Sequence, residues 1–558
     1  MDRRSTLAAI FSGNKHQTDD RLAKAPVFTV NTGLEPFSGQ WDFEKAAHLL
    51  RRTTFGPTYP QMNQAVTAGL EATVDQLFEN TPLPPPPVNY YFEEDPNVPV
   101  GATWIDQPYS QEVNLFFYRY QSLNGWTMGL MLNEGVSIRE KLTLFWHNHF
   151  SVANVNDPKF TYRYINLLRS FAWGNFRNLI KEITIDPAML RFLNGNQNTK
   201  NAPNENYARE VLELFTVGKG PLIGPGDYSN YTEEDVQALA KVLTGWRDRG
   251  YRTNNPDVPM SSEFVPSRHD TTTKTLSAHF NNAEIPDMGP DEYRYLIDII
   301  FQQDEVARFI CRKLYRWFVY YVIDDNAEVN VIEPMALLLI ENDYEIEPVL
   351  RALLGSAHFY DILSIGPVIK NPIDFILSTL KTPETAIPPV NSLFNNYNVW
   401  RRLLPLSEGM EMGYYDPPSV AGWKAYYQEP GYFRIWINAT TLQARMAFTD
   451  QMTSNGFTYG GQKIKIDSLH LMTLLNDPYN PDSVIDEFVK MFFPQPITPG
   501  QHAVLKETLL AGQPDYEWTV EYSDYEANPE NTALGASIAS RLDNLLKTML
   551  AMPEFYLS

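Results

Sequence analysis

Apolar residues recur at helical spacing along most of the chain. After residue 40, Phe43, Ala46, Ala47 and Leu50 fall at positions i, i+3, i+4 and i+7, which lie on one face of a helix. The same pattern predicts further helices at residues 59–78, 111–131, 137–150, 163–172, 176–184, 206–216, 233–244, 291–302, 305–322, 331–342, 348–354 and 534–552. Strand-like patterns are confined to 264–265 and 432–436. The periodicity therefore predicts an all-α fold.

Pro-rich and polar segments separate the predicted helices. Residues 82–87 read Pro-Leu-Pro-Pro-Pro-Pro, a stiff spacer that ends any helix, and residues 247–290 are rich in Pro, Asn, Ser and Thr. We expect a large multi-helix globular array with long Pro-rich loops and at most a minor hairpin. The expected divisions are an extended N-terminal arm (1–40), an N-terminal helical region with the main polar motifs (41–246), a polar insertion (247–290) and a C-terminal helical region (291–558).

Composition narrows the classes of partner. With 558 residues, of which 43% are hydrophobic, the chain is expected to be soluble and to bury more than one subcore. Its net charge of −22 argues against a nucleic-acid partner and against an anionic membrane surface. No apolar run is long enough for a transmembrane segment. The 13% of aromatic residues favours aromatic cores over a groove of aromatic platforms.

Neither cysteine usage nor the N-terminus decides the compartment. The single cysteine, Cys311, excludes an intrachain disulfide, and its apolar neighbours favour a buried packing role over that of a nucleophile. Arg3 and Arg4 resemble the start of a twin-arginine export signal, but the apolar run at 7–11 is shorter than such a signal needs. Bacterial cytoplasm and periplasm or cell envelope both stay open.

A polar stripe runs along the helix predicted at 206–216. If the helix starts near residue 204, Asn206, Arg209, Glu210 and Glu213 fall on one face and apolar side chains cover the rest. A stripe on a mostly buried helix must find partners or line a cavity. The favoured interpretation is an ion-pair network in which Arg209 holds Glu213 or a neighbouring carboxylate. The alternative is a site where Glu210 and Glu213 bind a cation or act as acid and base.

Histidines supply the other candidate chemistry. His147 and His149 are two residues apart, so on a helix they point in nearly opposite directions and cannot bind one metal ion. In an extended segment they could, although their aromatic neighbours favour burial. His269 and Asp270 lie in the polar insertion, where packing does not explain the pair, so a metal-binding or catalytic role is open.

Several segments, in this order along the chain, resemble a large bacterial family known as domain of unknown function 1800. They are HLLRRTTFG (48–56), REKLTLFWHNHF (139–150), NENYAREVLELFTVG (204–218), YTEEDV (231–236) with LTGW (243–246), HD (269–270) with Lys274, and PPSVAGW (417–423). The resemblance implies that these polar segments meet, and it brings no settled activity. Two departures are Leu276-Ser277 where Leu-Gly is usual and a missing Gln around Met412-Gly413, which would alter any site they belong to.

The resemblance also implies a setting. Relatives often carry export signals and are encoded beside proteins that resemble the alkaline-phosphatase fold, which implies an envelope role with such a protein as partner. Arg51 and Arg52 open the first matched helix, and they are expected to tie helices together through carboxylates rather than to bind an anionic substrate. Walker, nucleophile-elbow, His-Glu-x-x-His and Cys-x-x-Cys signatures are absent, so no nucleotide or haem cofactor is indicated.

Two hypotheses follow. The first is an envelope-associated scaffold or binding protein that acts with a partner. Its binding residues are Arg51, Arg52, Asn206, Arg209 and Trp423. The second is a metal-assisted hydrolase with a divalent metal ion in the helical core. Its catalytic residues are Glu210, His147, His269 and Asp270, and its metal ligands are Glu210, Glu213, His147 and His149. The sequence leaves the substrate, the metal and the oligomeric state open.

Overall fold

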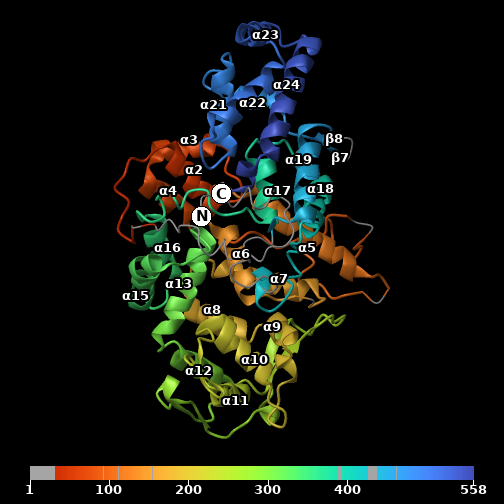
Figure 1. The fold of residues 1–558 in the computed structure, drawn as a ribbon. Helices are drawn as coiled ribbons and strands as arrows, with labels where there is room; N and C mark the ends of the chain where they lie inside the picture. Colours follow the sequence, from red (N-terminus) through yellow and green to blue (C-terminus); the bar gives the residue numbers. More distant parts are fainter. Residues whose placement is uncertain are drawn as a thin grey trace.

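The computed structural model describes residues 30, 32–91, 94–110, 112–153, 155–387, 392–424, 436–459 and 462–558. Helices dominate this part of the chain, and its strands form only two-stranded antiparallel sheets (Figure 1). The all-α prediction is confirmed. The division into an arm, two helical regions and an insertion stays a prediction.

The N-terminal helices occupy the middle of the molecule (Figure 1). They are α2 (Phe43–Thr53), α3 (Tyr59–Ala68), α4 (Leu70–Leu77), α5 (Leu115–Asn133), α6 (Arg139–Phe150) and α7 (Pro158–Ser170). The predicted helix 59–78 is divided at Gly69, whose φ of 88° is a left-handed conformation that a helix interior does not accept. Helices α2 and α6 both contribute side chains to the cavity described below, Arg52 from α2 and Lys141 and Asn148 from α6.

A second group of helices lies at the lower end of Figure 1 and carries all the hairpins between residues 222 and 285. Its helices are α8 (Phe176–Thr184), α9 (Pro187–Phe192), α10 (Glu205–Glu210) with a π-helical continuation (Val211–Thr216), α11 (Glu233–Val242) and α12 (Glu292–Ile300). Its hairpins are β1 (Leu222–Gly224) with β2 (Asp227–Tyr228), β3 (Trp246–Arg249) with β4 (Ser261–Phe264), and β5 (Lys274–Thr275) with β6 (Glu284–Ile285). The hairpin expected in the polar insertion is thus present and is one of several.

The remaining helices belong to the part of the chain after residue 303. They are α13 (Asp304–Phe318), α14 (Asp325–Ala327), α15 (Glu333–Glu341), α16 (Ile346–Leu354), α17 (Pro372–Lys381), α18 (Leu393–Glu408), α19 (Ala439–Thr453), α20 (Ser468–Met472), α21 (Pro481–Phe492), α22 (Pro499–Leu510), α23 (Asp515–Ala527) and α24 (Thr532–Ala551), with one hairpin of β7 (Phe457–Tyr459) and β8 (Gln462–Ile464). Residues 432–435 of the second predicted strand lie outside the described residues. Helix α18 packs along α5, and α24 packs against α19 and α22.

One contiguous apolar core runs from Ala46 in α2 to Leu557 near the C-terminal end. A smaller aromatic cluster sits where α5 meets α18 and includes Trp104. Cys311 is fully buried in α13, and burial raises the pKa of its thiol, so the predicted packing role is confirmed. None of the helices in the described ranges is long and apolar enough to span a bilayer.

Candidate functional site

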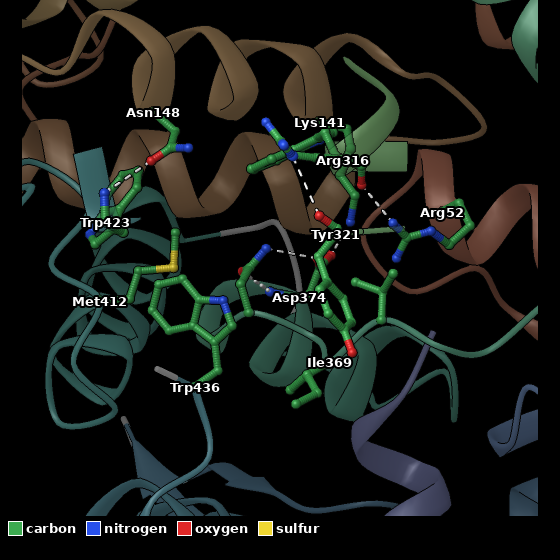
Figure 2. Close-up of a pocket in the computed structure, with 13 residues that line it drawn as sticks. Arg52, Lys141, Asn148, Arg316, Tyr321, Ile369, Asp374, Met412, Trp423 and Trp436 are labelled. Carbon is green, nitrogen blue, oxygen red and sulfur yellow. Dashed lines mark hydrogen bonds and ion pairs between the residues drawn. The ribbon is translucent and has the colours of Figure 1, made fainter. Parts of the chain in front are cut away.

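A cavity of about 100 Å³ is lined by residues of α2, α6, α13 and α17 (Figure 2). Its lining residues are Arg52, Lys141, Asn148, Arg316, Trp317, Tyr321, Val368, Ile369, Asn371, Asp374, Met412, Trp423 and Trp436. Asp374 is the one carboxylate among these described residues, whereas three of them are cationic. In a chain of net charge −22, this reversal of sign is the most unusual property of the cavity.

Arg52 reaches the cavity from the last turn of α2. Its Nε and Nη2 donate to the backbone carbonyls of Phe318 and Trp317, at 3.0 and 2.6 Å. Its Nη1 donates to the Ser558 hydroxyl at 2.6 Å. These carbonyls belong to the C-terminal end of α13, which has no intrahelical donors for them and favours a cation. Burial lowers the pKa of Arg52 to about 10, so the charge is held at a cost.

Arg51 likewise donates hydrogen bonds to backbone carbonyls near the end of another helix. Its Nη2 donates to the carbonyls of Lys490 and Met491, at 2.6 and 3.1 Å, near the end of α21. Both arginines therefore tie helices together, as expected, but their hydrogen bonds go to backbone carbonyls and, for Arg52, to the Ser558 hydroxyl, where carboxylates were expected. The positive charge of each guanidinium is consequently not neutralised by the group that it contacts.

Asp374 stands at the beginning of α17 and is held from two sides. The Asn371 side chain, which caps this helix, donates to Asp374 Oδ2 at 2.8 Å, and Lys141 of α6 forms an ion pair with Oδ1. Burial lowers the pKa of Lys141 despite this pairing. Asn148 lies two turns along α6 on the same face, which brings its side chain to the same cavity.

Two further buried basic side chains, of Lys370 and Arg445, lie close enough to Asp374 to feel its charge. Lys370 donates to the Phe555 carbonyl at 2.8 Å, and burial lowers its pKa to about 7. Arg445 of α19 donates through Nη2 to the Lys370 carbonyl at 2.9 Å, while its Nε and Nη1 are buried without a hydrogen-bond partner. Burial lowers the pKa of Arg445 to about 9. Four buried basic side chains, at 52, 141, 370 and 445, thus lie close to the single carboxylate of Asp374. Arg52 and Arg445 stay charged at neutral pH, whereas Lys370 is only partly charged.

His147 and His149 leave α6 in different directions, as their spacing on a helix predicts. His147 Nε2 donates to the Tyr414 carbonyl at 2.5 Å, and the Tyr164 hydroxyl donates to Nδ1 at 3.0 Å. Burial lowers the pKa of His147 to about 4. His149 Nε2 lies 3.2 Å from the Phe215 carbonyl, and its Nδ1 lies 2.9 Å from Lys313 Nζ. Every ring nitrogen is engaged, and a metal-binding or catalytic role for either residue stays a prediction.

The stripe on α10 and its π-helical continuation is mostly paired. Arg209 binds both carboxylate oxygens of Glu233 on α11, at 2.7 and 2.6 Å. Glu213 accepts from the Tyr231 hydroxyl at 2.9 Å, and burial together with Glu213 raises the pKa of Glu210. Asn206 is exposed. Arg209 holding a neighbouring carboxylate agrees with the favoured network interpretation. The metal and acid–base roles of Glu210 and Glu213 stay predictions.

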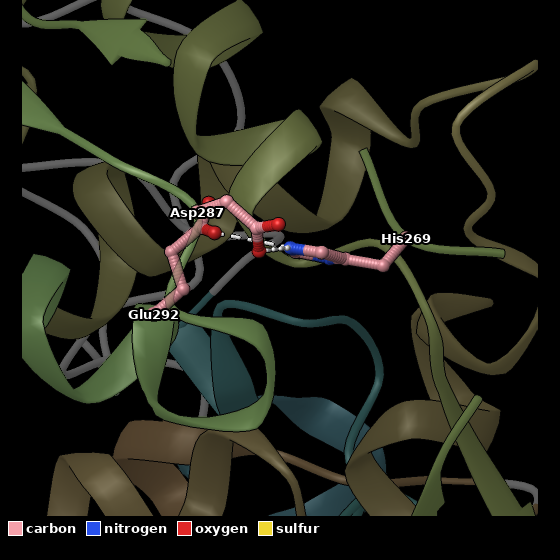
Figure 3. A group of neighbouring side chains, drawn as sticks. All are labelled: His269, Asp287 and Glu292. Atoms are coloured by element: carbon pink, nitrogen blue, oxygen red, sulfur yellow. Dashed lines mark hydrogen bonds and ion pairs between the residues drawn. The ribbon is translucent and has the colours of Figure 1, made fainter. Parts of the chain in front are cut away.

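A second polar cluster joins the end of the polar insertion to α12 (Figure 3). His269 Nε2 lies 3.0 Å from Glu292 Oε2 and 3.8 Å from Asp287 Oδ1. Lys274 Nζ lies 2.5 Å from Glu292 Oε1. Burial would lower the pKa of His269, but the hydrogen bonds with Glu292 and with the Thr244 carbonyl outweigh it and raise that pKa. Asp270 is not a member of this cluster; its Oδ1 accepts hydrogen bonds from the amide and the hydroxyl of Thr272.

Comparison with known proteins identifies the family of the chain. A profile of the family described as "Protein of unknown function (DUF1800)" matches residues 48–557. The chain belongs to this family. No curated protein and no solved structure matches it. The resemblance inferred from the sequence is therefore confirmed across nearly the whole chain, and membership of the family brings no activity with it.

Three of the segments that resemble this family meet at the cavity. Arg52 comes from the segment 48–56, Lys141 and Asn148 from 139–150, and Trp423 from 417–423. The segments 204–218 and 269–274 supply no residue to it. Sequence reasoning selected Arg52 and Trp423 but missed Lys141 and Asp374. The only sequence signal for Asp374 was its place three residues after a helix-capping Asn371.

Gly422 fastens the segment 417–423 onto α6. Its φ is 81°, and a Cβ there would lie 2.3 Å from Asn148 Oδ1, the atom that accepts a hydrogen bond from the Trp423 amide at 3.0 Å. We expect Gly422→Ala to lower the free energy of unfolding by about 2 kcal/mol, because strain and a clash add together. Urea unfolding measures this loss. Gly500→Ala, where a Cβ meets nothing within 4 Å, is the control, and equal stability of the two variants would contradict the expectation.

Proposed function

We propose that the protein is a binding protein that takes an anionic group into the cavity around Asp374. The observation that supports this is that the buried basic side chains of Arg52 and Lys141 line the cavity beside a single carboxylate, Asp374, with Arg445 and Lys370 also buried close to that carboxylate. Buried charge without a counter-charge is costly, and natural proteins rarely keep it unless a partner or ligand supplies the missing charge. An anion in the cavity would lie against Lys141 and Arg52 and would reduce that cost.

The dimensions of the cavity indicate the kind of anion. A volume of about 100 Å³ has room for a carboxylate or phosphate group. Trp317, Trp423 and Trp436 line the cavity beside the cations. An anionic group attached to an apolar or aromatic body therefore matches the lining better than an inorganic ion alone.

The setting at the cell envelope and the partner resembling the alkaline-phosphatase fold belong to the same proposal. They rest on the family resemblance, and the cavity adds a reason for a binding role. The alternative function, a metal-assisted hydrolase, draws its structural support from His269 and Glu292 rather than from the α10 stripe, because these two are buried against each other beside a further carboxylate.

We expect the protein to bind benzoate more tightly than inorganic phosphate, and Lys141→Met to weaken both by tenfold or more. Losing one charge-assisted contact costs at least about 1.4 kcal/mol, which is tenfold in Kd. Isothermal titration calorimetry on the full chain measures both constants. The control is Lys381→Met, since the Lys381 ammonium donates to the backbone carbonyls of Met131 and Glu134 and the residue does not line the cavity.

Two outcomes would overturn the proposal. One is that the unaltered protein binds neither benzoate nor phosphate. The other is that Lys141→Met and Lys381→Met weaken binding equally, because a general loss of packing would then explain the effect. Far-ultraviolet circular dichroism of each variant confirms that it is folded before the titration.

A further inference from the structure

We propose that His269, Asp287 and Glu292 form a binding site for one divalent transition-metal ion, with Zn²⁺ as the preferred occupant. This site is separate from the cavity around Asp374 and does not depend on the anion-binding proposal. Among the residues that the structure describes, these three form the group of His, Cys, Asp and Glu whose ligand atoms all lie within 4.8 Å of one another. Figure 3 shows the two carboxylates facing the same edge of the His269 ring.

The separations suit a common ion. Zn²⁺ takes nitrogen and oxygen ligands at about 2.0–2.2 Å, so two ligands of one ion lie up to about 4.4 Å apart. His269 Nε2 lies 3.0 Å from Glu292 Oε2 and 3.8 Å from Asp287 Oδ1. A small movement of Asp287, whose side chain is 44% exposed, brings all three atoms within reach of one ion.

The other nitrogen of His269 has the contact that metal-binding histidines make. His269 Nδ1 lies 2.9 Å from the Thr244 carbonyl, which can only accept, so the ring proton sits on Nδ1. With Nδ1 protonated, Nε2 faces Glu292 Oε2 and either carries a second proton, which makes the hydrogen bond described above, or offers its lone pair to a metal ion. A lone pair and a carboxylate oxygen repel each other at 3.0 Å unless a proton or a cation lies between them. The arrangement therefore provides a position that a metal ion can take.

Lys274 does not fill this position. Its ammonium lies against Glu292 Oε1, and the other carboxylate oxygen faces His269. Lys274 therefore offsets one charge and orients the carboxylate, which is the role that groups behind metal ligands have in known sites. Asp287 lies 3.8 Å from the imidazole, too far for a hydrogen bond, and it supplies the charge that a divalent ion would balance.

A catalytic triad is the competing interpretation of the same residues. Thr244 Oγ1 lies 3.1 Å from His269 Nδ1, so Thr244, His269 and Glu292 form a chain of the kind that activates a nucleophile. Thr244, however, is fully buried, its hydroxyl donates to the Lys241 carbonyl at 2.6 Å, and it accepts from the Asp270 amide at 2.8 Å. Its hydroxyl is committed to the fold and cannot reach a substrate, which favours the metal site.

The ligand set indicates the ion and its use. One imidazole and two carboxylates suit Zn²⁺ better than Ca²⁺ or Mg²⁺, which prefer oxygen ligands alone. Three protein ligands leave at least one position for water, which is the arrangement of catalytic zinc sites. The exposed Asp287 and its neighbour Met288, 41% exposed, place that open position at the surface. This site thus offers the metal-assisted alternative a different location from the α10 stripe.

The test is a titration of the full chain with ZnCl₂ after dialysis against EDTA, followed by calorimetry. We expect one equivalent of Zn²⁺ to bind, and Asp287→Asn to weaken binding tenfold or more, because an amide is a poorer ligand than a carboxylate. The matched control is Asp291→Asn, an exposed carboxylate in the same loop, which is expected to bind as the unaltered protein does. Substituting CoCl₂ gives visible absorption bands that Asp287→Asn changes and Asp291→Asn does not.

Three outcomes would overturn the site. They are no stoichiometric binding by the unaltered protein, equal affinity of Asp287→Asn and the unaltered protein, and binding that is lost only in a Glu210→Ala/Glu213→Ala double variant. The last outcome would place the metal on the α10 stripe. Benzoate titrations of Asp287→Asn keep this test distinct, because a failed metal site leaves anion binding unchanged.

Discussion

Replacing Arg169 by methionine is expected to lower the free energy of unfolding by about 3–5 kcal/mol. Arg169 of α7 binds Glu140 of α6 through two hydrogen bonds, at 2.6 and 2.9 Å, and both side chains are buried. Without the guanidinium, Glu140 would remain buried beside Glu134. The pKa of Glu134 is already raised to about 8, by burial and then by Glu140. Urea unfolding at neutral pH measures the loss.

Two further variants separate the charge effect from lost packing. Adding Glu140→Leu to Arg169→Met removes the stranded charge and is expected to restore most of the stability, since apolar replacements of buried pairs are often tolerated. Arg177→Met breaks the exposed pair with Asp343 and is expected to change stability by no more than about 1 kcal/mol. Similar losses in Arg169→Met and Arg177→Met would contradict the expectation.

Acid is expected to destabilise the protein through His147. Its pKa is lowered to about 4 by burial in the folded state, whereas an unfolded histidine has a pKa near 6.5. Below about pH 6.5 His147 binds a proton in the unfolded chain, whereas in the folded chain it stays neutral until the pH approaches 4. The free energy of unfolding therefore falls as the pH drops toward 4. From pH 7 to pH 4.5 this group alone is expected to cost about 2–3 kcal/mol.

The difference between the unaltered protein and His147→Phe isolates that contribution. At pH 7 the variant is the less stable, because the Tyr414 carbonyl loses its donor and Tyr164 its acceptor. At pH 4.5 the gap in unfolding free energy is expected to have narrowed by the same 2–3 kcal/mol. A difference in unfolding free energy that stays constant between pH 7 and pH 4.5 would show that folding does not lower the pKa of His147.

Helices with one buried face were predictable from the sequence, because burial itself creates the period of the apolar residues. Residues 176–184 were predicted and found as α8, with Phe176, Leu179, Ile180 and Ile183 buried. The break at Gly69 was missed because a single left-handed residue leaves the apolar pattern intact. The π-helical continuation at Val211–Thr216 was missed because it spans little more than one turn, which is too short for the apolar pattern to separate i→i+5 from i→i+4 hydrogen bonding.

The candidate site was harder to predict because its chemistry arises between distant segments. Asp374 lies in the first turn of α17, three residues after the N-cap Asn371. An acidic residue is common at this position because it stabilises the helix start, so the sequence does not indicate a further role. Lys370 and Arg445 show nothing in sequence that distinguishes them from exposed cations. His269 was singled out, but its partners Asp287 and Glu292 follow 18 and 23 residues later with no regular spacing. Only tertiary contacts bring these groups together.

The hydrogen bond from Arg52 to Ser558 spans 506 residues, and this has a consequence for how the chain folds during synthesis. Arg52 is synthesised before its partners, because the carbonyl groups that it binds follow 265 and 266 residues later and Ser558 follows later still. At typical synthesis rates of about 5–20 residues per second, the guanidinium of Arg52 has none of these hydrogen-bond partners for tens of seconds. The cavity can therefore form only after α13 and α17, which supply its other walls, have been synthesised.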